Sequence, residues 1–301
     1  MEIRRLGLVM LSLPWLVLIS CSHQKTYFGI AIEDVGNPLL GYYKSGQFVP
    51  MRPAEDFGQG MKDIISFNRS FPVDKVFRGI MSDGSETKIQ IKNKKGYLEG
   101  MGDNIFQLEI RQAGKTISPM AEVLFWTSNI RVKFLKSFDV KLDEAALKQI
   151  QDEAIRLWKE ALEELPGDDE MRTLARVELL TPTIQRVEGV EEAVTVLIPT
   201  TIKMDASFVE NGLKHEFEHV DERGSFFFIY SIAERRIIFG SFGHPEWNPS
   251  AIGMVTVKPL IYFQIWGNSL AYFLGEHSFA WEHDGYAIFN LKSGRVLLQS
   301  D

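Results

Sequence analysis

Short apolar runs separated by turn residues dominate this chain and restrict it to a fold built mainly from antiparallel strands. Residues 27–32 precede Gly36-Asn37-Pro38, and residues 76–81 precede Ser82-Asp83-Gly84. Short runs bounded by Gly, Asn, Asp and Pro are typical of strands and hairpins. The pattern recurs at residues 88–91 (followed by a predicted turn at 92–96), 106–111, 121–126, 130–134, 176–180, 183–187, 193–199, 226–232, 236–242, 255–266, 270–274, 286–290 and 296–299. We therefore expect antiparallel sheets, arranged as a sandwich or a curled sheet.

Residues 142–165 carry a different period. Their apolar side chains recur in steps of three and four, which places them on one face of a helix. These side chains are Leu147, Ile150, Ala154, Leu157, Trp158, Ala161 and Leu165. Asp143 is placed to cap the first turn, and Pro166-Gly167 ends the helix. Glu144 with Lys148 and Asp152 with Arg156 are spaced as i, i+4 ion pairs. The sequence predicts one long amphipathic helix within a β-rich α+β fold.

The predicted helix separates two β-rich parts of the chain. The N-terminal part covers residues 21–140, and the C-terminal part, residues 141–301, begins with the helix. The whole chain carries ordinary proportions of hydrophobic (45%) and charged (24%) residues, as folded proteins do. The pattern is compatible with two domains and equally with one domain that contains both parts.

The first 22 residues have the features of an export signal. Arg4 and Arg5 precede an apolar run over residues 6–19, which is shorter than the roughly 20 residues of a membrane-spanning helix. The run ends in Leu18-Ile19-Ser20-Cys21, which resembles the lipobox of bacterial lipoproteins. The resemblance implies that residues 1–20 are a signal peptide, that cleavage falls before Cys21, and that the Cys21 sulfur receives lipid.

Cys21 is the one cysteine of the chain, so the resemblance implies a single point of attachment. Several acyl chains, each worth about 0.8 kcal/mol per buried CH₂, anchor a protein without a transmembrane helix. The lipoprotein resemblance also implies export, and Ser22 in place of aspartate implies delivery to the outer membrane if the source is a diderm bacterium. No disulfide is expected in the mature chain.

The charge of the chain argues against a nucleic-acid partner. It carries 33 Lys and Arg against 40 Asp and Glu, whereas phosphate backbones require clustered basic residues. The partners that we expect are membrane lipid, through the acylated Cys21, and an envelope protein or glycan.

Five of the six histidines lie between residues 215 and 283. The segment His215-Glu216-Phe217-Glu218-His219 satisfies H-E-x-x-H, in which two histidines one helical turn apart hold zinc and the glutamate activates water. In this motif the chain resembles zinc metallopeptidases, which implies His215 and His219 as metal ligands and Glu216 as the catalytic residue. The charged Glu218 departs from the pattern of that family.

The zinc interpretation depends on local structure. Side chains at i and i+4 lie about 5 to 6 Å apart at Cβ on a helix, but about 13 Å apart on a strand. Residues 221–224 resemble a turn into the apolar run 226–232, which favours a β-hairpin over residues 213–232. A zinc-dependent hydrolase therefore remains the alternative, and no cofactor is expected under the first interpretation.

Further polar and aromatic residues near the C-terminus are candidates for ligand-binding loops. They are His244, Glu246, Trp247, Glu276, His277, Trp281, Glu282, His283 and Asp284. Loops on a rigid sheet commonly carry function, and tryptophan can stack on a sugar or a peptide. The other interpretation is that these are turn residues and histidines at the edge of the core, with the tryptophans inside it.

The chain contains no P-loop, no G-x-S-x-G element and no C-x-x-C. These observations favour a lipid-anchored envelope protein that acts as a binding or scaffolding module.

Overall fold

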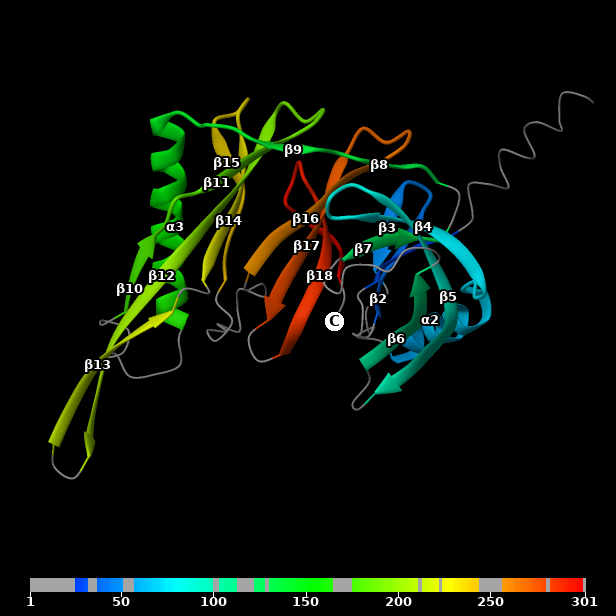
Figure 1. Ribbon diagram of the computed structural model, residues 1–301, viewed down its shortest axis with the longest axis horizontal. Helices are drawn as coiled ribbons and strands as arrows, with labels where there is room; N and C mark the ends of the chain where they lie inside the picture. Colours follow the sequence, from blue (N-terminus) through cyan, green and yellow to red (C-terminus); the bar gives the residue numbers. More distant parts are fainter. Residues whose placement is uncertain are drawn as a thin grey trace, which may run out of the picture. The chain divides into compact units, whose positions relative to one another are not determined.

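The computed structural model of the chain consists mainly of antiparallel strands (Figure 1). It describes residues 25–31, 37–50, 57–99, 103–112, 122–127, 130–164, 175–210, 213–221, 224–243, 256–279 and 282–299. The β-rich α+β class is thus confirmed. Contacts divide the chain into unit 1, Met1–Arg131 with Leu297–Ser300, and unit 2, Val132–Val296 with Asp301. The expected division after residue 140 falls within unit 2.

Unit 1 contains a sheet that closes on itself. Its elements are β1 (Thr26–Ala31), β2 (Asn37–Lys44), β3 (Gln47–Pro50), α2 (Phe57–Ser70), β4 (Lys75–Met81), β5 (Glu86–Glu99), β6 (Asp103–Gln112) and β7 (Val123–Trp126). The strand order is β1-β7-β4-β5-β6-β2-β3, and β1 also pairs with β2. Every pairing around this ring is antiparallel. Residues 92–96, predicted as a turn, instead lie within β5, where the register shifts between Ile91 and Asn93.

Helix α2 was not predicted from the sequence. Ile64, Phe67 and Phe71 are buried in one cluster with side chains of the sheet, but Gly58 and Gly60 weaken the local helical preference. Lys94 of β5 donates hydrogen bonds from Nζ to the carbonyls of Phe67, at 3.1 Å, and Phe71. The carbonyls at the end of α2 are therefore satisfied by a residue distant in sequence.

Unit 2 contains two sheets and one described helix. The elements are β8 (Val132–Phe134), β9 (Ser137–Asp139), α3 (Glu144–Glu164), β10 (Ala175–Leu179), β11 (Thr183–Val187), β12 (Ala193–Glu210), β13 (Leu213–Asp221), β14 (Ser225–Ser231), β15 (Arg236–Gly243), β16 (Thr256–Ile265), β17 (Ala271–Phe279) and β18 (Glu282–Asn290). Strand β19 (Val296–Gln299) begins at Val296 of unit 2, and its remaining residues are assigned to unit 1. The first sheet has the order β15-β14-β12-β11-β9, with β10 and β13 also paired to β12. The second has the order β19-β18-β17-β16-β8.

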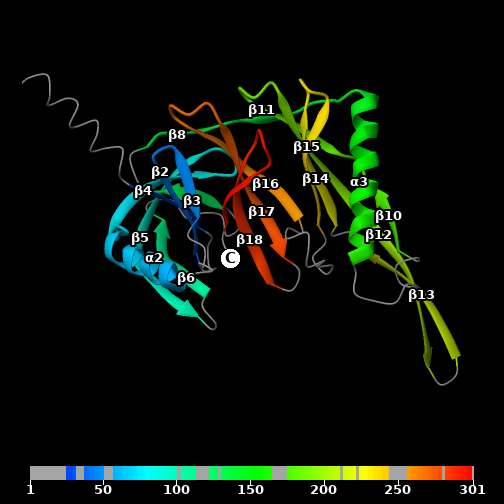
Figure 2. The same ribbon diagram turned by 180° about the vertical axis from the view of Figure 1, so that it is seen from behind.

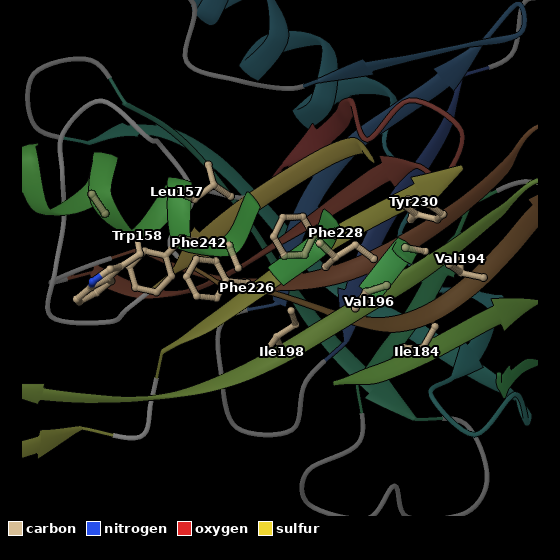
Figure 3. Packing of buried hydrophobic residues seen from close by; sticks show 14 of the residues in the cluster. Leu157, Trp158, Ile184, Val194, Val196, Ile198, Phe226, Phe228, Tyr230 and Phe242 are labelled. Atoms are coloured by element: carbon tan, nitrogen blue, oxygen red, sulfur yellow. The ribbon is translucent and has the colours of Figure 1, made fainter. Parts of the chain in front are cut away.

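Strand β14 lies in the middle of three layers. Phe226, Phe228 and Tyr230 pack in one cluster with α3, as Figure 3 shows for the labelled side chains. Phe227 and Ile229 pack in a different cluster with the second sheet. All five side chains are buried. The strand is continuously apolar because neither of its faces meets water.

Helix α3 confirms the prediction for residues 142–165. The Asp143 side chain caps its first turn, since Ala146 N donates to Asp143 Oδ1 at 2.8 Å. The predicted ion pairs Glu144–Lys148 and Asp152–Arg156 are wrong, because Lys148 and Arg156 pair with other carboxylates. Lys148 binds Asp152 at 2.7 Å, and Arg156 binds Glu153 at 2.6 Å and also Glu160.

The hairpin expected over residues 213–232 is also wrong. Strands β13 and β14 do not pair with each other, because both pair with the long strand β12. Its first half, from Ala193 to Pro199, pairs with β14, and its second half, from Ile202 to Glu210, pairs with β13. The β12–β13 hairpin extends past the end of α3 as a two-stranded ribbon (Figure 2).

Neither of the described helices, α2 and α3, has the length and apolar character needed to cross a membrane.

Candidate functional site

Four turns of unit 2 meet around a pocket of about 890 Å³. They connect β11 to β12, β14 to β15, β16 to β17, and β18 to β19. The lining residues are Gly189, Val190, Glu191, Glu192, Ala193, Ser231, Glu234, Arg236, Ile238, Ser269, Leu270, Ala271, Asn290, Leu291, Lys292 and Ser293. We call this hollow the turn-end pocket.

Each of these turns contains a residue with a positive φ. Gly189, Gly267 and Gly294 have φ values of 75°, 82° and 68°, which glycine adopts easily because it has no Cβ. Arg235 has a φ of 51°, and its guanidinium donates a hydrogen bond to Asp143 Oδ2 at 2.8 Å. The shape of each turn is therefore encoded locally, at four separate places in the sequence.

Short polar side chains hold the turns in place. Asn290 Oδ1 accepts hydrogen bonds from the backbone of Lys292 at 2.8 Å and of Ser293 at 3.1 Å. Asn268 Oδ1 accepts one from the backbone of Leu270 at 3.0 Å. Such bonds from Asn to the following backbone groups stabilise turns. The wall of the pocket is consequently built from fixed turns.

The turn-end pocket combines apolar residues with a charged set. Ala193, Ala271 and Leu291 are buried, whereas the charged lining residues are Glu191, Glu192, Glu234, Arg236 and Lys292. Lys292 Nζ lies 3.8 Å from Glu192, and Arg236 forms an ion pair with Glu234. These exposed pairs are worth at most about 1 kcal/mol each. Apolar walls with a few polar groups are typical of ligand-binding pockets.

The β16–β17 turn adds large apolar side chains that reach solvent. Trp266 is 71% exposed and Leu270, which lines the pocket, is 36% exposed. Tryptophan is among the residues that contribute most to binding at protein interfaces. This turn therefore supplies a contact surface next to the pocket.

A second hollow, of about 480 Å³, lies between α3 and β15. It is lined by Gln149, Glu153 and Arg156 of α3 and by residues 236–240 of β15. Hydrogen bonds from Arg156 hold the pKa of Glu153 below its usual value, so this carboxylate stays charged. We call it the helix-side hollow. Arg236 and Ile238 line both hollows, which places β15 between them.

The zinc hypothesis requires residues 215–219 to form a helix, but the structure has a strand there. His215, Glu216 and His219 lie in strand β13, opposite Phe208, Ser207 and Met204 of β12. Positions four apart on a strand are separated by about 13 Å. Among the side chains that the structure describes, no group of three or more His, Cys, Asp or Glu is placed to hold a metal ion.

Five of the residues expected in ligand-binding loops lie in paired strands instead. Glu276 and His277 belong to β17, and Glu282, His283 and Asp284 belong to β18. The register pairs His277 with Gly285 and Ser278 with Asp284. The turn-end pocket takes residues from the start of β17 and the end of β18, so these five residues lie toward the opposite end of the same hairpin. Glu276 Oε2 is 3.8 Å from Lys258 Nζ.

Cys21, His244, Glu246, Trp247 and Trp281 lie outside the described residues. The turn-end pocket itself was not found from the sequence. Ser293-Gly294 was expected to be a hairpin loop, and the structure confirms that turn through a 2.8 Å bond from Gly294 N to Asn290 O. The sequence carries the signal for each turn, but nothing in it brings the four turns together.

Comparisons with known proteins identify no relative. No family model, no curated protein and no solved structure matches this chain.

Proposed function

We propose that this chain is an exported lipoprotein, anchored through lipid on Cys21, whose folded body binds another component of the cell envelope. The observation that carries the proposal is the position of the one cysteine, directly after Leu18-Ile19-Ser20 and a short apolar run. In a diderm source, Ser22 directs the protein to the outer membrane.

The distance along the chain supports a role close to the membrane. Strand β1 begins at Thr26, five residues after Cys21. A tether of this length spans at most about 18 Å, since an extended chain covers 3.3 to 3.6 Å per residue. A lipid on Cys21 therefore keeps the start of β1 close to the bilayer surface. The turn-end pocket, with Trp266 beside it, supplies a binding surface on the body.

The anchor is tested by substituting Cys21 in the full-length chain. Wild-type protein should be recovered in the membrane fraction with the mass of residues 21–301 plus lipid. The variant Cys21→Ala should keep residues 1–20 and carry no lipid, because it lacks the sulfur that accepts lipid. Ser22→Ala is the matched control and should be processed normally. An unchanged mature mass and an unchanged membrane fraction for Cys21→Ala would overturn the proposal.

A further inference from the structure

Strand β15 is an edge strand without the usual protection. It ends the sheet β15-β14-β12-β11-β9, and no strand in the described part of the chain pairs with its outer side. An open edge presents unpaired N–H and C=O groups to other chains, and proteins usually protect such edges by shortness or by charge. Between Arg236 and Gly243, β15 carries only the uncharged residues Ile237-Ile238-Phe239-Gly240-Ser241-Phe242.

Other described edge strands show the protection that β15 lacks. Strands β8 and β9 have three residues each, and β19 has four. Strand β13 is longer but carries Lys214, Glu216 and Glu218. Strand β15 has eight residues, so neither its length nor its composition protects it.

The backbone of β15 changes register beside the two hollows. Ile229 pairs with Phe239 and Tyr230 with Ile237, so Ile238 is an extra residue in the strand. As a result Ile237 packs against the cluster that contains α3, whereas Ile238 and Phe239 pack against the cluster between the sheets. Bulges of this kind commonly lie next to functional sites. From Phe239 to Gly243 the pairing is regular.

Both hollows border the start of β15: the helix-side hollow along residues 236–240, and the turn-end pocket at Arg236 and Ile238. Successive side chains of a strand point to opposite faces of the sheet. On one face the helix-side hollow is lined by Gln149, Glu153 and Arg156. On the other face the turn-end pocket has apolar residues such as Ile238 and Leu291. A strand that docks on this edge would therefore place polar and apolar side chains alternately in the two hollows, which is how strand addition achieves specificity.

Charge distinguishes between the possible occupants of the edge. Residues 132–296 contain 17 Lys and Arg against 26 Asp and Glu. The cations of the two hollows and of the turn before β15 are already paired, Arg235 with Asp143, Arg236 with Glu234, Arg156 with Glu153 and Glu160, and Lys292 with Glu192. A second copy would bring two acidic units together, whereas a basic segment is complementary.

We propose that β15 is the docking strand for an extended, basic segment of a partner protein, which adds to the sheet as a further strand. Apolar side chains of the segment occupy the turn-end pocket, and its polar side chains face the helix-side hollow. This inference names the partner for the binding role proposed above, and it does not depend on the lipid anchor.

The test uses the full-length protein in detergent micelles and a synthetic peptide of about ten residues, long enough to form one strand. In the peptide, Val and Thr alternate between a Lys pair at each end. Two further copies are N-methylated at alternate amides, one on each edge of the peptide. The amides of residues 236–243 that are not bonded to β14 should become protected from hydrogen exchange when the parent peptide binds. One methylated copy should bind like the parent, and the other at least about tenfold more weakly, because only one edge of the peptide can pair with β15.

Substitutions in the protein, at residues that line the two hollows, test the same contacts. Ile238→Lys and Gln149→Lys should each weaken binding about tenfold or more, since each adds a cation where a cationic peptide docks. Gln149 lies on the exposed face of α3, so Gln149→Lys should fold normally. Peptide binding can then still be measured if Ile238→Lys fails to fold. Val76→Lys introduces a lysine in place of a β-branched apolar residue, as Ile238→Lys does, but at a 51% exposed position of unit 1, and should bind normally.

Three outcomes would overturn the inference: unprotected amides in β15, equal binding of the two methylated copies, or unchanged binding by both hollow variants. A dimer with β15 protected in the absence of peptide would assign the edge to a second copy, and it would overturn the inference as well. None of these readouts depends on processing at Cys21, so the anchor and the docking strand can fail separately.

Discussion

The hydroxyl of Thr195 lies 2.8 Å from the hydroxyl of Tyr262 and joins the two sheets of unit 2 across their shared core. Both residues are buried, Thr195 on β12 and Tyr262 on β16. The contact is a polar link in a layer that is mainly apolar, and Figure 1 shows the two strands in their separate sheets.

Removal of the two hydroxyls is expected to have unequal effects. Thr195→Val leaves the buried Tyr262 hydroxyl without its partner, which costs about 1 to 3 kcal/mol. Tyr262→Phe should cost less, because Thr195 Oγ1 is also 3.4 Å from the Gln185 carbonyl, which can accept its proton. The double variant should recover part of the loss caused by Thr195→Val. Denaturant unfolding of all four proteins measures these differences, and strictly additive effects would contradict the proposed coupling.

Stability should fall at high pH because of Tyr262. Burial raises the pKa of this phenol to about 12, whereas an unfolded tyrosine has a pKa of about 10. The unfolded state therefore loses its proton first, and the contribution of Tyr262 is complete below pH 10 and is lost as pH rises toward 12. The loss should be on the order of 3 kcal/mol, since each pKa unit corresponds to about 1.4 kcal/mol. It is measured as the difference in pH dependence between wild type and Tyr262→Phe, whose unfolding free energy should decline less.

The cap of helix α3 should contribute measurably to stability. Asp143→Ala removes the acceptor for Ala146 N and should cost about 1 kcal/mol of unfolding free energy. Asp143→Asn retains an acceptor for this bond and loses only the exposed pair with Arg235, so its cost should be smaller. Thermal unfolding compares the two variants. Equal losses would show that the ion pair, and not the cap, is the important contact.

Two glycines of the turn-end pocket should differ in their tolerance of alanine. Gly189 and Gly294 both have positive φ, but a Cβ on Gly189 meets open space. A Cβ on Gly294 would lie 2.3 Å from Phe239 Cβ. Gly189→Ala should therefore cost about 1 kcal/mol from backbone strain, in the range known for such residues, and Gly294→Ala should cost more. Equal unfolding midpoints for the two variants would mean that the β18–β19 turn does not rest on β15.

Treatment with a metal chelator should leave the stability of the protein unchanged. His215 and His219 lie on a strand, where two positions four apart cannot both reach one zinc ion. The purified full-length chain should contain no stoichiometric zinc, and a chelator should not shift its unfolding midpoint. Elemental analysis of wild type and of His215→Ala checks this prediction. Stoichiometric zinc in wild type that is absent from His215→Ala would restore the hydrolase alternative.

Much of the secondary structure was predictable because its signals are local. The apolar period identified α3, and Asp143 marked its start. Turn residues such as Ser82-Asp83-Gly84 lie between strands that do pair, as β4 and β5 show. These features depend on the conformational preferences of neighbouring residues, which act wherever the segment lies in the fold.

Predictions of which strands pair and which side chains contact each other were less successful. These contacts depend on the surrounding fold and not only on neighbouring residues. The run 213–221 was correctly expected to be extended, yet it pairs with β12 and not with β14. Arg156 lies within reach of Asp152, Glu153 and Glu160 on one helix surface, and the sequence gives no reason to prefer two of them. Helix α2 was missed because the burial of Phe67 and the contact from Lys94 come from the sheet.

The sequence by itself determined the β-rich class, the long helix and the turn residues. Each of these follows from the period of apolar residues or from a few adjacent side chains. Only the tertiary structure decided that four turns surround one pocket and that β15, which has no second paired strand in the described part of the chain, borders two hollows. The physical reason is that both features join segments far apart in sequence, through strand pairing and burial that no local preference specifies.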